Sequence, residues 1–331
     1  MVRDMIRKII LPGIVLTFCL SGCTMIPEYS RPGAPVPVKW PDGPAYRESR
    51  LPSIHPVAAD LPWRQFFTDD RLREVIVSAL ENNRDLRIAA LNVERARAYY
   101  RIQRAELLPT VDATGSGYRE RVPADLSSTG RRTTMEEYRA DLGISSWEID
   151  FFGRIRSLEK RALEEYLATE EARRSAQILL ISEVANVYLT LAMDRENLQL
   201  ARSNLEAQQA SYNLIRRRFE VGIAPKLDLR QVQQRVDAAR VDVARYTELA
   251  AQDENALNLL AGKPVPAVLL PQGLSAVTPL PDVSPGMSSE VLLLRPDILR
   301  AERLLQASNA DIGAARAAFF PRISLTTAFG T

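Results

Sequence analysis

The sequence predicts an α+β chain of long helices and a few amphipathic strands, arranged as two structural repeats of which the second is truncated. Three observations support this prediction. Long stretches without glycine or proline carry apolar residues at helical spacing. Short segments between them alternate apolar and polar residues with a period of two. The order of helix, proline and strand recurs farther along the chain, which is typical of an internal repeat.

Residues 1–22 have the features of a secretory signal peptide. A basic start is followed by the 12-residue apolar run Ile9–Leu20, which is too short to span a bilayer, since a spanning helix needs about 20 residues. The run ends in Leu20-Ser21-Gly22-Cys23, which resembles the bacterial lipobox. This resemblance implies cleavage before Cys23 and a covalent lipid on it, N-palmitoyl and S-diacylglycerol. The alternative is an ordinary signal peptide with an incidental cysteine. Position 24 is a threonine and not the aspartate that retains many such lipoproteins at the inner membrane, so the outer membrane is favoured.

Composition excludes several classes of function. Without residues 1–22, the chain has 40 basic and 40 acidic residues, interspersed along the sequence, so nothing points to nucleic acid. The only cysteines are Cys19 and Cys23, and the only histidine is His55. This inventory is too small for a zinc site or a histidine-dependent catalytic triad, and no phosphate-binding glycine loop is present. We therefore expect no enzyme activity, no metal and no cofactor besides the covalent lipid.

The first repeat is assigned to residues 63–262. Before it, residues 23–62 are rich in proline and are predicted to form an extended, lipid-anchored segment. Residues 63–108 contain neither glycine nor proline and are predicted to be helical, with Asp69 and Asp70 as N-cap candidates and Pro109 as the stop.

Two strands are expected next. A short polar strand is predicted within residues 110–122, and a loop within residues 123–134. In the second strand, Tyr138, Ala140, Leu142 and Ile144 alternate with polar or small residues, so one face is apolar.

A long helical hairpin completes the repeat. No glycine or proline occurs between Gly153 and Gly222, and a helix of these 68 residues would be about 100 Å long. Apolar residues recur every seventh position in its second half, and a turn at 222–226 leads into a returning helix with apolar spacings of three and four. Asp253 is the one polar break in the returning stripe, and Gly262 is the stop. A plain coiled-coil spacer has the same periodicity and stays open as an alternative.

The second repeat begins after a proline-rich linker, residues 263–289, and occupies residues 290–331. Aligning Asp85 with Asp297, an offset of 212, also aligns Arg104-Ala105 with Arg316-Ala317 and Pro109 with Pro321. Beyond Pro321, residues 322–329 alternate again as a strand. A second long hairpin is expected to be missing from this chain.

These parts predict a membrane β-barrel continued by a long α-helical barrel. Strands of about ten residues with one apolar face suit an outer-membrane barrel, and a barrel in lipid must close because open edges are not tolerated there. A few strands per chain cannot close a barrel, so we expect oligomerisation.

Three signatures resemble the TolC superfamily of outer-membrane factors, in its NodT-type lipoprotein branch. They are Trp63-Arg64-Gln65-Phe66-Phe67 with Asn83-Arg84-Asp85-Leu86, the segment Ser146–Ile155, and Arg218-Phe219-Glu220-Val221-Gly222. The resemblance covers essentially all of the mature chain. It implies a homotrimer in outer-membrane lipid that passively conducts substrates as the exit duct of a tripartite pump. It also implies a periplasmic adaptor and an inner-membrane transporter of the RND type as partners.

The resemblance also implies roles for individual residues. In the family, the tip of the long hairpin docks the adaptor, and here the tip is Val221, Gly222 and Ile223; the simpler interpretation is that Gly222 only permits a left-handed turn. Asp228 matches a family aspartate of the periplasmic gate, although it equally suits a helix N-terminus.

Two other functions share some of these sequence features. A periplasmic structural or adaptor-like lipoprotein built on a coiled-coil hairpin would share the anchor and the hairpin but would not need strands with an apolar face. A lipid-anchored secreted hydrolase is disfavoured, because Ser145-Ser146 lacks the glycines of a nucleophile elbow and His55 is the only histidine.

Overall fold

The structure is a computed structural model, and it describes residues 24–33, 35–36, 61–282 and 289–330. The predicted signal peptide, Cys23 and His55 lie outside the described residues. The described chain divides into two compact units. Unit 1 contains residues 24–33, 92–170 and 299–330, and unit 2 contains residues 35–36, 61–91, 171–282 and 289–298.

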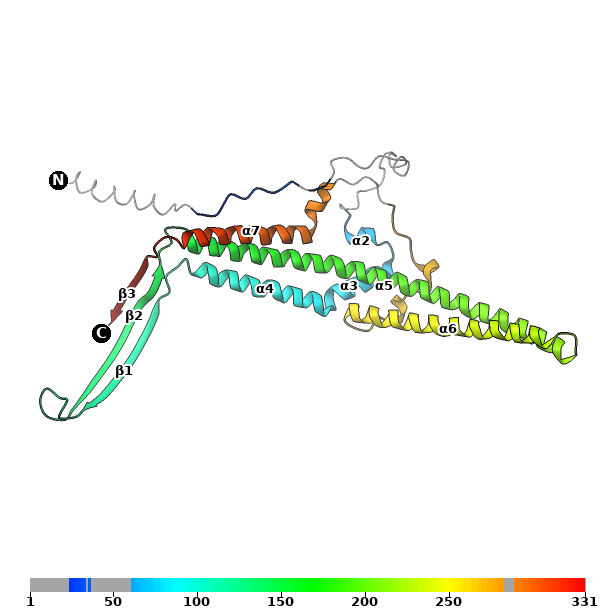
Figure 1. Cartoon of the computed structure of the whole chain (residues 1–331), viewed down its shortest axis with the longest axis horizontal. Coiled ribbons are helices and arrows are strands. Elements are labelled where there is room, and N and C mark those ends of the chain that lie inside the picture. Colours follow the sequence, from blue (N-terminus) through cyan, green and yellow to red (C-terminus); the bar gives the residue numbers. More distant parts are fainter. Residues whose placement is uncertain (1–23, 34, 37–60, 283–288, 331) are drawn as a thin grey trace. The chain divides into compact units, whose positions relative to one another are not determined.

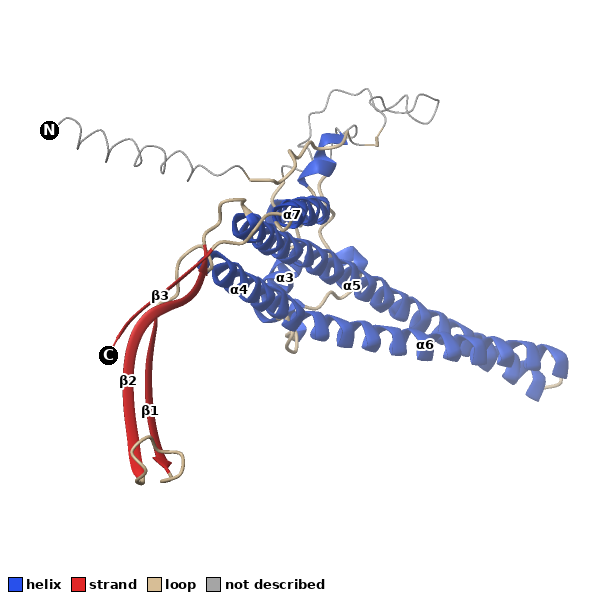
Figure 2. Cartoon of the chain, turned by 60° about the vertical axis from the view of Figure 1, so that its left-hand side comes forward, coloured by secondary structure: helices blue, strands red, loops and turns tan. Residues whose placement is uncertain are grey.

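Unit 1 contains a three-stranded antiparallel sheet in the order β1-β2-β3, drawn in red in Figure 2. Its strands are β1 (Asp112–Val122), β2 (Thr133–Glu148) and β3 (Ser324–Gly330). In the register of the β1–β2 hairpin, Gly117 lies opposite Tyr138 and Asp112 lies opposite Gly143. The strand predicted around residues 138–145 is thus longer than expected, because pairing with β1 extends it back to Thr133.

Three helical segments accompany the sheet in unit 1: the second part of α4 (Arg84–Ala105), the first turns of α5 (Arg154–Glu220), and α7 (Pro296–Ala317). Tyr100 of α4 stacks on Tyr166 of α5 with ring centroids 6.2 Å apart. On the other side, Glu164 of α5 accepts a hydrogen bond from Arg303 of α7 at 3.1 Å. The first segment of α5 therefore lies between α4 and α7, as Figures 1 and 2 both show.

Residues 24–33 run along α7. The amide of Asn309 donates to the Pro27 carbonyl oxygen at 2.7 Å, and Arg31 Nε donates to Glu302 at 2.7 Å. A Cβ atom on Gly313 would lie 2.6 Å from Ile26, so the absence of a side chain lets the segment approach the helix closely. Residues 24–33 contain no helix or strand, and the extended segment expected over residues 23–62 stays a prediction.

Unit 2 has a hydrophobic core built from helix α3 (Asp70–Asn82), the middle of α5, the end of α6 (Lys226–Ala261) and the linker after it. Ile76, Val184, Leu191 and Leu257 are fully buried there. Short helical turns lie in the linker and after it, at Ala267–Leu269, Leu274–Ala276 and Ser289–Leu294. Leu270 of the linker is also buried, so part of the predicted proline-rich linker is a packed element of this core.

The long hairpin is confirmed: α5 is one helix of 67 residues, and α6 returns over 36 residues. The burial of the apolar residues predicted at every seventh position of α5 decreases along the helix. Val184 and Leu191 are fully buried, Leu198, Leu205 and Tyr212 are half-buried, and Phe219 is exposed. The apolar stripe of α5 therefore remains uncovered toward the tip of the hairpin.

The single helix predicted over residues 63–108 is wrong. The segment forms three helices, α2 (Trp63–Phe66), α3 and α4. The break between α3 and α4 falls at Asn83, whose extended backbone is held by two contacts: its side-chain amide donates to the Leu260 carbonyl at 3.0 Å, and its side-chain oxygen accepts from Leu86 N at 2.8 Å. The expected N-cap Asp69 is confirmed, since its carboxylate accepts from Leu72 N at 2.9 Å.

Helices α4 and α7 each have 22 residues, and both of their bounds differ by 212 positions. The strands that follow them, β1 and β3, begin at Asp112 and Ser324, which are also 212 apart. The helix and strand starts therefore keep the offset that the sequence alignment indicates.

Candidate functional site

The tip of the α5–α6 hairpin is built by a Schellman motif. Helix α5 ends at Glu220, and Gly222 has a left-handed backbone with φ of 79°. Ile223 N donates to the Arg218 carbonyl at 2.8 Å, and Gly222 N donates to the Phe219 carbonyl at 3.0 Å. These are the two hydrogen bonds of the motif, and they satisfy carbonyls that the helix end would otherwise leave open.

The motif leaves its apolar residues in solvent. The residue after the left-handed glycine commonly packs on the last turn of the helix. Here that residue is Ile223, and the last turn presents Arg217 and Arg218. Ile223 is 67% exposed and Val221 is 70% exposed. The structure thus brings the predicted tip residues together as a small exposed apolar surface on a rigid turn.

Asp228 lies close behind this turn. Helix α6 begins at Lys226, so Asp228 occupies its first turn and is partly exposed. A carboxylate in this position interacts favourably with the helix dipole. The structure therefore accommodates Asp228 as a helix-start residue, and its predicted role in a gate stays a prediction.

A second feature held by specific contacts is the corner between β2 and α5. Arg154 pairs with Glu148 through two hydrogen bonds of 2.8 and 2.6 Å, and Asp150 accepts from Arg156 N at 3.0 Å. Gly153 turns the chain with φ of 74°. The hydrogen bonding that Arg154 donates to the Glu148 carboxylate is the main reason why the pKa of Arg154 is raised. The segment Ser146–Ile155, which resembles a family signature, therefore fixes the angle between strand and helix.

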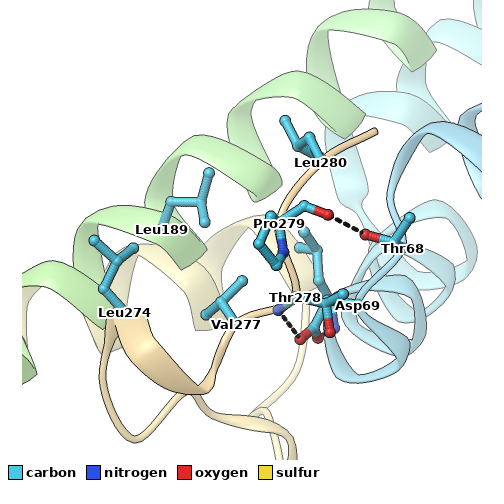
Figure 3. Close-up of a pocket in the computed structure, with 9 residues that line it drawn as sticks. Thr68, Asp69, Leu189, Leu274, Val277, Thr278, Pro279 and Leu280 are labelled. Atoms are coloured by element: carbon cyan, nitrogen blue, oxygen red, sulfur yellow. Dashed lines mark hydrogen bonds between the residues drawn. The ribbon is translucent and has the colours of Figure 1, made fainter. Parts of the chain in front are cut away.

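A third feature lies where the linker packs against α3 and α5 in unit 2. An apolar pocket of about 260 Å³ opens between Leu72, Leu189, Leu274 and Val277, among others (Figure 3). The polar groups beside the pocket form hydrogen bonds with one another. Thr68 donates to the Pro279 carbonyl at 2.7 Å, and Thr278 N donates to Asp69 at 3.2 Å. Nearby, burial raises the pKa of Tyr188 to about 12 while its hydroxyl donates to the Leu269 carbonyl at 3.2 Å. These contacts hold the linker in place.

Sequence reasoning missed two buried acidic groups. Glu164 is only 1% exposed and is held by Lys160 at 2.7 Å and by Arg303 at 3.1 Å. Asp194 of α5 is 5% exposed and faces Asp253 of α6. Among the described residues, one carboxylate oxygen of Asp253 is buried without a hydrogen-bond partner. Burial, followed by the Asp194 carboxylate, raises the pKa of Asp253. The polar break at Asp253 in the α6 stripe was the only sequence signal for this pair.

Among the described residues, no group of three or more histidine, cysteine or acidic side chains is arranged to hold a metal ion. The three features are an exposed apolar tip, a hydrogen-bonded corner and a packed linker. Among the described residues of these three features, no nucleophile lies beside a base.

The fold is that of TolC-like outer-membrane channels. The crystal structure of the open state of the Neisseria gonorrhoeae MtrE outer membrane channel matches with a TM-score of 0.78 and 36% identity, over 93% of this chain and 67% of that one. A membrane protein from Pseudomonas aeruginosa matches with a TM-score of 0.79 and 41% identity, over 93% of this chain and 68% of that one.

The chain belongs to the outer membrane efflux protein family, whose model matches residues 75–263. The antibiotic efflux pump outer membrane protein ArpC of Pseudomonas putida is 50% identical over 98% of this chain. Outer membrane protein OprJ of Pseudomonas aeruginosa is 42% identical over 96% of this chain. The chain spans 66% of the length of each of these two relatives.

Proposed function

We propose that this chain is part of an outer-membrane channel subunit that passively conducts substrates out of the cell as the exit duct of a tripartite efflux system. The observation that carries the proposal is the long α5–α6 hairpin, which ends in exposed Val221 and Ile223 and belongs to the same chain as an amphipathic antiparallel sheet. The name of the relative ArpC supports it, since it describes an efflux pump outer membrane protein.

The sheet supports a barrel shared between copies. Each outer strand of the described sheet, β1 and β3, has one edge without a strand partner among the described residues. Open edges are not tolerated in lipid, so further strands must pair with them. We propose that a second structural repeat and two further copies of the subunit supply these strands, giving a homotrimeric β-barrel continued by an α-helical barrel.

The tip supports a docking role. Hydrophobic side chains on a rigid turn suit a helical partner with its own apolar surface. We propose that Val221, Gly222 and Ile223 contact the hairpin of a periplasmic adaptor, which in turn binds an inner-membrane transporter of the RND type. Asp228 is proposed as a gate residue near that contact.

The anchor completes the proposal. Acylation of Cys23 in outer-membrane lipid would tether the segment that runs along α7 from residue 24 onward. Metabolic palmitate labelling tests this point: the label should be lost in Cys23→Ala, and retained labelling would remove the anchor from the proposal.

The competing function is a periplasmic coiled-coil lipoprotein without a barrel. It would share the α5–α6 hairpin, but it gives no reason for an 11-residue β1 paired along its whole length with β2. The family match and the efflux names of the relatives also favour the channel.

The test of the channel uses the full-length protein in cells that lack their own outer-membrane efflux channel. Ile223→Asp should abolish efflux of a fluorescent pump substrate, while cross-linked trimers stay intact. Val268→Asp is the matched control, because Val268 is an apolar residue of the linker that is also mostly exposed. Wild-type efflux by the Ile223 variant would contradict adaptor docking at the tip, and cross-linking to dimers only would contradict the trimer.

A further inference from the structure

One face of the β1–β2 hairpin changes from apolar to basic along its length. In β2, Leu142, Ala140 and Tyr138 share a face because side chains alternate along a strand. Their β1 partners, which lie on the same face, are Ala113, Gly115 and Gly117. Farther toward the loop at residues 123–132, the same face continues with the pairs Arg119–Glu136 and Arg121–Thr134. The face that we assign to lipid therefore ends in arginines.

These arginines form a cluster. Arg119, Arg121, Arg132 and Thr134 together line an open concavity of about 420 Å³. Arg119 is paired with Glu136 at 2.8 Å. Within the described parts of the chain, the side chains of Arg121 and Arg132 make no ion pair. Only one of the three guanidinium groups is paired with a carboxylate, so the cluster keeps an excess of positive charge.

The opposite face of the hairpin has a different charge pattern at the same level. There Glu120 accepts from Tyr118, and Glu137 pairs with Arg139. On strands β1 and β2, the arginine without an ion pair, Arg121, thus lies on the face that continues the apolar stripe.

The depth of the cluster matches a lipid head-group layer. Glu136 and Thr134 lie two and four residues beyond Tyr138, which is about 7–14 Å along a strand. For a strand tilted by about 40°, this is roughly 5–10 Å of depth. The polar layer on each side of a bilayer is roughly 5–8 Å thick. Tyr138 then occupies the level of the aromatic girdle, and the arginines lie among the head groups.

We propose that Arg119, Arg121 and Arg132 bind the phosphate groups of phosphorylated lipid head groups that surround the barrel in the outer leaflet. The proposal rests on the proposed function, because it requires the apolar face of the sheet to contact lipid. Guanidinium groups bind phosphate through paired, charge-assisted hydrogen bonds, and the open concavity leaves room for such a group. The apolar stripe below the cluster provides a surface for the acyl chains of the same lipid.

The test measures binding to the full-length protein in nonionic detergent micelles. Three probes are compared: bisphosphorylated lipid A, dephosphorylated lipid A and inorganic phosphate. The variants are the double change Arg121→Gln with Arg132→Gln, and the control Arg131→Gln. Arg131 is exposed in the same loop but does not line the concavity, so its replacement removes the same kind of charge beside the site.

We expect the wild-type protein to prefer the bisphosphorylated lipid and the double variant to bind it at least about tenfold more weakly, because charged hydrogen bonds are lost. Arg131→Gln should bind like the wild type. Equal binding by the double variant, an equal loss in Arg131→Gln, or no preference for the phosphorylated lipid would overturn the proposal. Displacement of the lipid by inorganic phosphate at equal phosphate concentration would assign the site to a soluble anion instead.

Trimer cross-linking and efflux of the same variants separate this inference from the proposed function. Intact trimers and efflux without lipid preference would overturn only the lipid site. Failure of the wild-type protein to form a membrane-inserted oligomer would overturn both.

Discussion

Replacing Gly262 with alanine should destabilise the junction between the long hairpin and the α3–α4 break. Gly262 follows the last residue of α6 and has a left-handed backbone with φ of 71°. A Cβ atom at this position would lie 2.7 Å from the carbonyl carbon of Asn82 and even closer to its oxygen. Two separate costs therefore act at this position, one conformational and one steric.

Gly222 separates the two costs. Its φ of 79° is nearly the same, but a Cβ atom there would meet no other atom within 4 Å. Gly222→Ala should therefore cost only the left-handed conformation, about 1–2 kcal/mol. Gly262→Ala carries this cost and must also displace the backbone at Asn82, which adds about 1–3 kcal/mol for overpacking in a tight site. The second variant should thus be the less stable of the two.

Thermal unfolding of the two full-length variants, followed by far-ultraviolet circular dichroism, measures the difference. Hydrogen exchange should locate it: amides around Asn83 and Leu260 should exchange faster in Gly262→Ala, because the 3.0 Å hydrogen bond between these residues is disturbed. In Gly222→Ala these amides should stay protected. Equal losses of stability in both variants would refute the assignment of a steric role to the Asn82 contact.

Two further predictions concern buried carboxylates. The pKa of Asp253 is raised above 3.8 by burial and by Asp194, so the folded protein keeps this proton to higher pH than the unfolded chain does, and stability should fall as pH rises from about 3.8 through the folded pKa. Asp253→Asn should remove this dependence, and parallel plots of melting temperature against pH for the two proteins would contradict the prediction. Glu164→Ala should lower stability by about 1–3 kcal/mol because Lys160 and Arg303 lose their buried acceptor, although both are exposed enough to reach water. In urea unfolding, Glu164→Gln should lose less stability than Glu164→Ala. A larger loss of stability in Glu164→Gln than in Glu164→Ala would show that the pairing with Arg303 is not what stabilises this contact.

Local signals along the sequence were sufficient for the long elements. The absence of glycine and proline between Gly153 and Gly222 predicted one helix, and α5 spans Arg154–Glu220. Gly222 and Gly262 were expected at helix ends, and both have the left-handed backbone that such positions favour. Alternation of apolar and polar residues predicted strands, because a period of two is a property of the strand itself.

The tertiary structure decided what depends on segments far apart in the chain. Asn83 breaks a stretch with no helix-breaking residue, because its amide is held by the Leu260 carbonyl 177 positions away. The pairing of β1 with β2 lengthened the second strand and brought Arg121 and Arg132 to one concavity. Periodicity reports which face of an element is apolar, but the partner of that face is fixed only when distant segments pack together. The sequence by itself therefore determined the long hairpin, its tip at Ile223 and the alternating strands. The tertiary structure decided the helix break at Asn83, the length of β2 and the buried charges, because these depend on distant segments.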